Sequence, residues 1–131
     1  MGKKTLVTIS VIVVLLGGLI YMAVSSGQST QAKRSYGQVQ QDIKQGAHLY
    51  DVRTPQEYAA GRFAGAENFP LQTMQAGTLP NVPKDTLIYL HCQSGNRSSQ
   101  AAQLLRGAGY TNVVDLGGLR DVQALGAKLN S

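Results

Sequence analysis

The sequence predicts an α/β domain with a parallel sheet and helices on both faces, preceded by one N-terminal transmembrane helix. Short apolar runs with strand character at 47–52, 87–90 and 111–116 alternate with helical segments. The polar residues Asp51 and Cys92 fall at the ends of two of these runs, and ligands of parallel sheets gather at that edge. A continuous apolar stretch near the N-terminus adds the membrane segment.

The length and charge of the chain restrict the classes of protein to consider. Its 131 residues suffice for one domain and an appendage. The net charge of +5 is spread along the chain without a basic run, which argues against a nucleic-acid partner and suits small anionic substrates. A single cysteine excludes an internal disulfide and any multi-cysteine metal site, so we expect neither a metal nor a cofactor.

Residues 1–24 predict a signal anchor. Lys3 and Lys4 precede the apolar segment Leu6 to Val24. A helix over that segment, at about 1.5 Å per residue, approaches the roughly 30 Å thickness of the bilayer core. The two lysines place the N-terminus in the cytoplasm. We therefore expect a single-pass cell-membrane protein whose catalytic domain is extracytoplasmic, either periplasmic or on the cell surface.

A cleaved signal peptide is the alternative for the same segment. Ala23-Val24-Ser25 offers small residues for cleavage, and the domain would then be secreted or periplasmic. The apolar segment is longer than the about 7 to 15 residues typical of a cleaved signal, which favours the uncleaved anchor. Residues 25–35 are small, polar and without period, which predicts a flexible linker, and the domain occupies 36–131.

The first half of the domain predicts a helix, a strand and a second helix. Apolar side chains four residues apart predict a helix over 36–45 that ends at Gly46, and the strand 47–52 follows. The sequence Thr54-Pro55-Gln56-Glu57 is typical of a capping box with proline at the first helical position. This capping role explains Thr54 and Glu57 better than catalysis does.

The remaining elements follow from turn residues and short apolar runs. Three segments lie between the second helix and the central strand. They are a turn into a short strand over 61–70, a helix over 71–75 and a loop over 77–85. After the strand 111–116, a turn at Gly117-Gly118 leads into a final helix through Ala127.

The stretch from Leu87 to Gly109 carries the chemistry. Leu87 to Leu90 form a buried strand, Cys92 to Arg97 a polar loop, and Ser98 to Gly107 a helix with apolar residues at helical spacing. A loop that enters a helix N-terminus turns backbone N–H groups toward one point and holds an anion there. Because the only cysteine opens this loop, the sequence predicts a stabilised thiolate nucleophile.

Three motifs in this order resemble the rhodanese-like sulfurtransferases. Their active-site loop is similar to the segment Cys92-x-x-Gly95-x-Arg97-Ser98. Their upstream signature is similar to Asp51-Val-Arg-Thr-Pro-Gln-Glu-Tyr together with the following residues 61–71. Gly117-Gly118-Leu119 matches the C-terminal part. The resemblance covers roughly residues 36 to 130 and implies a single-domain module of parallel α/β fold. It departs from the family at Arg62, where many members have histidine, and in lacking an aromatic residue shortly after the double glycine.

The resemblance implies sulfur transfer through Cys92 as the catalytic residue. A sulfane sulfur would pass from thiosulfate or a persulfide to Cys92 and then to cyanide or a thiol, with a protein acceptor as a further option. The substrate would be bound by the active-site loop, which consists of Gln93, Ser94, Gly95, Asn96, Arg97 and Ser98. Arg97 would contact the anion or form a structural ion pair with Asp51 or Glu57.

Asp51 and Arg53 are expected to position the loop, and the histidines have no assigned role. His91 precedes Cys92 in an extended segment, so its side chain is expected to point away from the thiol.

Two other functions use a similar loop. One is a non-catalytic persulfide carrier, and the other is a dual-specificity-type phosphatase, whose loop is one residue longer and suits the larger phosphate group. An inert buried cysteine is the remaining interpretation.

Overall fold

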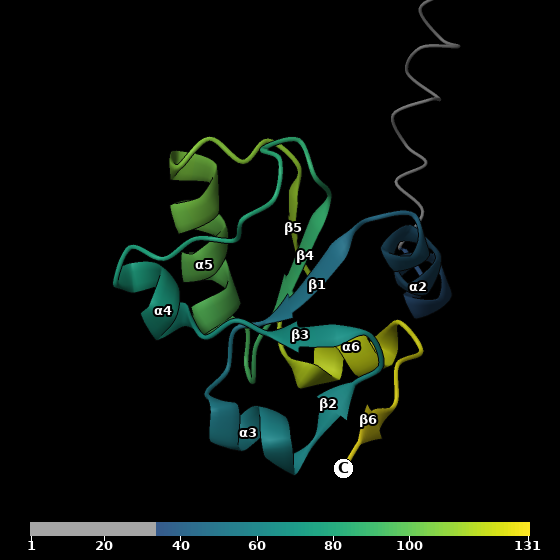
Figure 1. Cartoon of the computed structure of the whole chain (residues 1–131). Helices are drawn as coiled ribbons and strands as arrows, with labels where there is room; N and C mark the ends of the chain where they lie inside the picture. Colours follow the sequence, from purple (N-terminus) through teal and green to yellow (C-terminus); the bar gives the residue numbers. More distant parts are fainter. Residues whose placement is uncertain (1–33) are drawn as a thin grey trace, which may run out of the picture. The chain divides into compact units, whose positions relative to one another are not determined.

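The structure is a computed structural model that describes residues 34–131. Its central feature is a parallel sheet of four strands in the order β3-β1-β4-β5 (Figure 1). The elements are α2 (Tyr36–Lys44), β1 (His48–Asp51), α3 (Pro55–Ala60), β2 (Arg62–Phe63), β3 (Ala66–Asn68), α4 (Leu71–Gln75), β4 (Ile88–His91), α5 (Asn96–Gly107), β5 (Val113–Asp115), α6 (Leu119–Ala124) and β6 (Leu129–Asn130).

Alternate residues of the two central strands enter two separate cores. Tyr50 of β1 and Leu90 of β4 pack in the core beneath α4 and α5. Their neighbours Leu49 and Tyr89 pack in the opposite core with α2 and α6. Figure 1 shows α4 and α5 on one side of the sheet and α2 on the other. The predicted parallel α/β fold with helices on both faces is therefore confirmed.

The register of β1 and β4 brings the ends of both strands to the same edge. Asp51 pairs with His91 as the last residue of each strand. The pairing continues one residue further, because the Val52 amide donates to the His91 carbonyl at 3.0 Å. The segments that leave β1 and β4 therefore begin side by side, which places Cys92 at the carboxyl edge of the sheet.

Several element boundaries differ from the prediction. The helix α5 begins at Asn96, inside the predicted loop, and the single strand predicted within 61–70 is split into β2 and β3 by a turn at Gly65, whose φ is 80°. The last helix ends at Ala124, and Gly126 with φ 105° turns the chain into β6. The strand β6 was not predicted; it pairs antiparallel with β2.

The predicted membrane anchor, residues 1–24, and nearly all of the linker lie outside the described residues. Within residues 34–131, no helix has the length and apolarity that crossing a bilayer requires.

Candidate active site

The loop after β4 closes on the Cys92 sulfur. Gly95 has φ 100° and ψ −18°, a left-handed conformation that glycine adopts without a steric penalty. This turn brings the Gly95 N–H to 2.9 Å from Cys92 Sγ, where it donates to the sulfur. The residue that caps the N-terminus of α5 and the residue that directly follows β4 are thereby joined into a ring.

Ser98 completes the inner wall of the ring. Its Oγ lies 3.5 Å from Cys92 Sγ and donates to the Gly95 carbonyl at 3.1 Å. Cys92 and Ser98 both have an exposed fraction of 0%. The structure therefore brings the predicted loop residues together, but it places the sulfur behind them instead of at the surface.

The Gly117-Gly118 turn supports the loop from behind. The Cys92 amide donates to the Gly117 carbonyl at 3.0 Å, and the Leu119 amide donates to the Gln93 carbonyl at 3.0 Å. A Cβ on Gly118 would lie 2.7 Å from the Gln93 oxygen, so only glycine fits there without a shift. The sequence predicted a turn at this position, and the structure shows that the turn also holds the active loop.

Arg97 forms a bidentate ion pair with Glu57. Its two terminal nitrogens donate to the two carboxylate oxygens at 2.7 and 2.9 Å. Glu57 also accepts the Thr54 amide at 3.1 Å, which confirms the predicted capping box. The hydrogen bonds from Arg97 are the main reason that the pKa of Glu57 falls to about 2. Of the two predicted roles for Arg97, the structure shows the ion pair.

The pKa of Arg97 is raised in turn. The hydrogen bonds to Glu57 are the largest cause, and the negative charge of a Cys92 thiolate adds to the effect. The sequence offered Asp51 and Glu57 as possible ion-pair partners of Arg97, and in the structure the partner is Glu57. Glu57 thus has this role in addition to its capping role.

Asp51 and Arg53 form a buried ion pair, as expected of neighbours. The Arg53 Nη2 lies 2.7 Å from Asp51 Oδ2 and also donates to the Gly61 carbonyl at 2.6 Å. Both side chains are almost fully buried. Neither side chain forms a hydrogen bond with the loop 92–98, and His91 lies between Asp51 and the start of that loop.

His91 fills the space between Asp51 and the Cys92 backbone. Its Nε2 lies 3.5 Å from Asp51 Oδ2, and its Nδ1 lies 3.3 Å from the Cys92 carbonyl oxygen. The ring packs edge-on against Phe63, which belongs to the core opposite that of Cys92. The side chain thus points away from the thiol, as predicted. Burial lowers the pKa of His91, which favours the neutral imidazole.

Arg62, the departure from the family pattern, lies outside this arrangement. Its side chain is exposed, and the guanidinium carbon sits 5.2 Å from the centre of the Tyr58 ring. Within residues 34–131, no group of three or more His, Cys, Asp or Glu side chains could hold a metal ion.

The fold and the site together define a class of protein in which a cysteine lies in an anion-binding loop at a helix N-terminus. A sequence model of the family described as "Rhodanese-like domain" matches residues 35–125. The chain belongs to this family, and it is a rhodanese-type enzyme.

Curated relatives and solved structures support the assignment. The chain is similar to "Thiosulfate sulfurtransferase PspE" of Escherichia coli, 37% identical over 76 residues, which cover 57% of this chain and 73% of the relative. It is 34% identical over 86 residues to the human "Thiosulfate:glutathione sulfurtransferase", covering 55% and 74% of the two chains. A crystallised rhodanese-like domain from Anabaena superposes with a TM-score of 0.58 at 30% identity, covering 66% of this chain and 100% of that domain.

Proposed function

We propose that this protein is a sulfurtransferase that moves a sulfane sulfur from thiosulfate or a persulfide, through a Cys92 persulfide, to cyanide or a thiol. The observation that carries the proposal is the Gly95 N–H donating to Cys92 Sγ at 2.9 Å within the loop. An amide that donates to sulfur favours the thiolate over the thiol, and the thiolate is the attacking species. The names of the relatives point to the same reaction.

In the first step the Cys92 thiolate attacks the outer sulfur of thiosulfate. A bond forms between Sγ and that sulfur, the sulfur–sulfur bond of thiosulfate breaks, and sulfite leaves with its electron pair. The negative charge then lies on the outer sulfur of the Cys92 persulfide. No proton moves in this step, so a general base is not required once the thiolate is formed.

The second step returns the enzyme to its starting state. Cyanide attacks the outer sulfur, thiocyanate leaves, and the electron pair of the broken bond returns to Cys92 Sγ. Both steps concentrate negative charge inside the loop. The amides of Gln93 to Ser98 stabilise it, and Arg97 contributes through the N–H groups that Glu57 does not use. Asp51 and Arg53 act as positioning residues behind His91.

The burial of Cys92 adds a requirement to this mechanism. Its exposed fraction is 0%, so no donor can touch the sulfur unless the loop widens. Gln93, Ser94 and Asn96 are the exposed members of the loop, and the first two directly follow Cys92. We expect their side of the loop to shift as the donor enters. Between turnovers the closed loop keeps water and oxidants from the thiolate.

The test is sulfur transfer by the full chain, purified in a mild detergent, with thiosulfate as donor and cyanide as acceptor. We expect thiocyanate to accumulate catalytically with the wild-type protein and not with Cys92→Ala, measured by the absorbance of the ferric complex. Circular dichroism of both proteins controls for folding. A folded wild-type protein that produces no thiocyanate would contradict the proposal.

The burial of Cys92 also favours a second function, that of a persulfide carrier. The ring that shields the thiolate would equally shield a stored persulfide from small molecules. A carrier would gain the mass of one sulfur atom at Cys92 after exposure to thiosulfate, but it would not transfer that sulfur to cyanide. Intact-mass measurement before and after cyanide addition separates the two functions.

We also propose that the domain is tethered outside the cytoplasm by the N-terminal segment. The support is the apolar run from Leu6 to Val24 behind Lys3 and Lys4. Mass spectrometry of the protein extracted from membranes should find the intact N-terminus. A mass that begins at or near Ser25 would show a cleaved signal instead.

A further inference from the structure

A pocket of about 550 Å³ lies between the active loop and α6. Its two walls come from the residues after Cys92 and from the start of α6. The lining residues are Gln93, Ser94, Gly118, Leu119, Arg120, Asp121 and Gln123. Because Gln93 and Ser94 are the residues expected to move when the loop widens, a molecule in this pocket lies against the entrance to the sulfur.

The pocket is too large for the small substrates of the proposed reaction. Cyanide and thiosulfate have a few heavy atoms each, whereas pockets of roughly 300 to 1,000 Å³ hold ligands of cofactor or drug size. The side-chain amides of Gln93 and Gln123 offer both donors and acceptors, as peptide groups require. The dimensions and the lining therefore fit a short peptide or a molecule of similar size.

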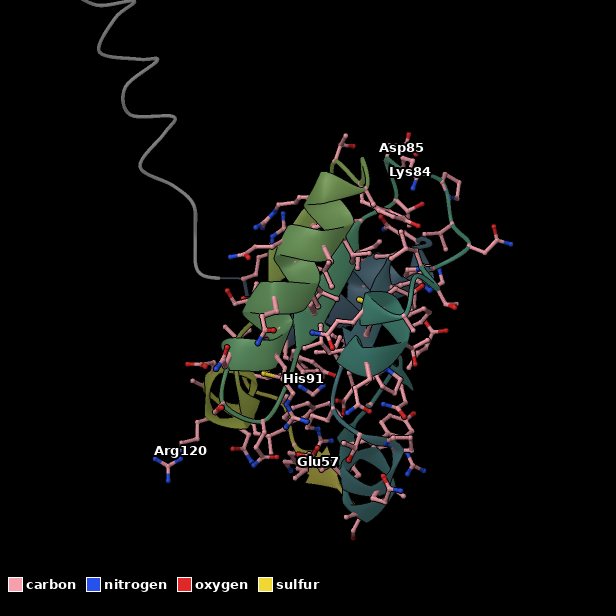
Figure 2. All side chains as sticks on the ribbon, turned by 90° about the vertical axis from the view of Figure 1, so that its left-hand side faces the viewer. Glu57, Lys84, Asp85, His91 and Arg120 are labelled. Atoms are coloured by element: carbon pink, nitrogen blue, oxygen red, sulfur yellow. The ribbon has the colours of Figure 1, made fainter. Side chains whose placement is uncertain are left out.

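Arg120 is the only cationic side chain in the lining. The other arginines near the loop are engaged, Arg97 by Glu57 and Arg53 by Asp51. Arg120 is exposed, and it forms no ion pair with any side chain of residues 34–131. Figure 2 shows its side chain extending outward, well apart from that of Glu57.

The one acidic side chain of the lining is directed to the backbone. Asp121 Oδ2 accepts the Gly118 N–H at 2.8 Å, which holds the carboxylate at the glycine turn. It therefore does not form an ion pair with Arg120. A guanidinium without a partner binds a carboxylate through two parallel hydrogen bonds, which makes an anionic ligand the chemical match for this pocket.

We propose that the pocket binds a thiol acceptor of peptide size and that Arg120 holds its carboxylate. This inference rests on the proposed sulfurtransferase function. The acceptor thiol loses its proton to solvent and attacks, as a thiolate, the outer sulfur of the Cys92 persulfide. A new sulfur–sulfur bond forms, the bond to Cys92 breaks with its electron pair returning to Sγ, and the acceptor leaves as a persulfide anion. Arg120 acts as a specificity residue, because it contacts the acceptor away from the reacting sulfur.

The test compares two thiols as acceptors for the full chain. The probes are reduced glutathione, a tripeptide thiol with carboxylates, and 2-mercaptoethanol, which has none. Each acceptor persulfide reacts with a second thiol molecule to give a disulfide and hydrogen sulfide, and the sulfide is measured. Arg120→Gln should lower the ratio of kcat/KM for glutathione to that for 2-mercaptoethanol about five- to tenfold, as expected when one partly solvated charge pair is lost.

Two further variants show whether the effect belongs to the site. Arg120→Lys should retain part of the preference, because the charge remains and the paired geometry is lost. Arg106→Gln removes an exposed arginine near the opposite end of α5, where it donates to Val113, and should leave the ratio unchanged. A ratio within twofold of wild type in Arg120→Gln would overturn the inference.

A binding measurement separates this inference from the proposed function. S-methylglutathione cannot accept sulfur, so calorimetry reports its binding without turnover. Weaker binding to Arg120→Gln than to wild type supports the site even if thiocyanate is never formed. Equal binding to both proteins, or none to wild type, rejects the site even if cyanide is an active acceptor.

Discussion

Two contacts set the chemistry of the Cys92 sulfur. The Gly95 amide has a hydrogen fixed by the backbone and directed at Sγ, so it stabilises only negative charge on the sulfur. The Ser98 hydroxyl can rotate. It accepts from the thiol in the neutral state, and it can donate to the sulfur once the thiolate forms. In doing so it gives up its bond to the Gly95 carbonyl, which couples the charge on the sulfur to the loop conformation.

Ser98→Ala should slow sulfur transfer about fivefold while leaving the protein folded. The substitution removes one donor to the thiolate and leaves the Gly95 carbonyl without its side-chain partner, a loss of about 1 kcal/mol. The measurement is kcat/KM for thiosulfate with cyanide as acceptor. Ser99→Ala is the matched control, because the neighbouring hydroxyl is exposed and should not affect the rate. Equal rates in the two variants would contradict the assigned role of Ser98.

At the scale of elements, the turn before α6 determines how the active loop is held. The Gly118 Cα faces the backbone of Gln93 and Ser94 so closely that a Cβ would lie 2.7 and 2.9 Å from their atoms. The atoms in its way belong to the backbone, which cannot rotate aside as a side chain can. The loop and the turn therefore have to move together.

Gly118→Ala should destabilise the domain by about 1 to 3 kcal/mol, as expected for an extra methyl group in a filled space. It should also lower turnover, because the shift is forced onto the residues next to Cys92. The control is Gly107→Ala in α5, where a Cβ meets no atom within 4 Å and alanine favours the helix. In urea unfolding, the free energy of unfolding should be lower than that of wild type for Gly118→Ala and higher than that of wild type for Gly107→Ala. A neutral Gly118→Ala would show that the turn does not constrain the loop.

Sequence patterns predicted the elements whose signals are local. The capping box at Thr54, the helix end at Gly46 and the strand before Cys92 all follow from neighbouring residues, and the structure has them. The ion pair between Glu57 and Arg97 and the β2–β6 pairing join distant parts of the chain. No periodicity encodes such pairings. Because β2 and β6 are very short, they also lack the alternation by which a strand is predicted.

The depth of Cys92 could not be predicted either. A strand end followed by polar residues indicates a surface loop, and the sequence placed the thiol in that loop. The positive φ of Gly95 turns the loop back over the sulfur, so that polar residues cover it. Which atoms the turn would cover depends on the start of α5, and that helix begins two residues earlier than predicted.

At the scale of the whole molecule, charged side chains are buried at the carboxyl edge of the sheet. Asp51 and His91 are the paired last residues of β1 and β4, and both are buried, as is Arg53. Burying charges costs desolvation energy, which is offset here by the paired geometry of Asp51 and Arg53. The surface ion pair of Glu57 and Arg97 then closes the active edge between α3 and α5.

This arrangement makes folding stability depend on pH in a defined direction. The pKa of His91 is lowered in the folded state, chiefly by burial, so below its ordinary value of 6.5 the unfolded chain binds a proton that the folded chain does not. The pKa of Glu57 falls from 4.5 to about 2, so between those values the unfolded chain again binds more protons. Both groups therefore make stability decrease as the pH falls, His91 first and Glu57 later.

We expect the free energy of unfolding, measured with urea from pH 8 to pH 3, to be highest above pH 7 and to fall in two stages. Glu57→Gln keeps the side-chain shape but removes the titrating group and the ion pair. The variant should be less stable than wild type at pH 7. The difference should shrink as the pH falls below 4.5 toward 2, because Glu57 of the unfolded wild-type chain then binds a proton that folded Glu57 does not. A difference that stays constant over that range would show that Glu57 contributes through its capping hydrogen bonds and not through its charge. Wild-type stability that rises on acidification would contradict the assignment of both groups.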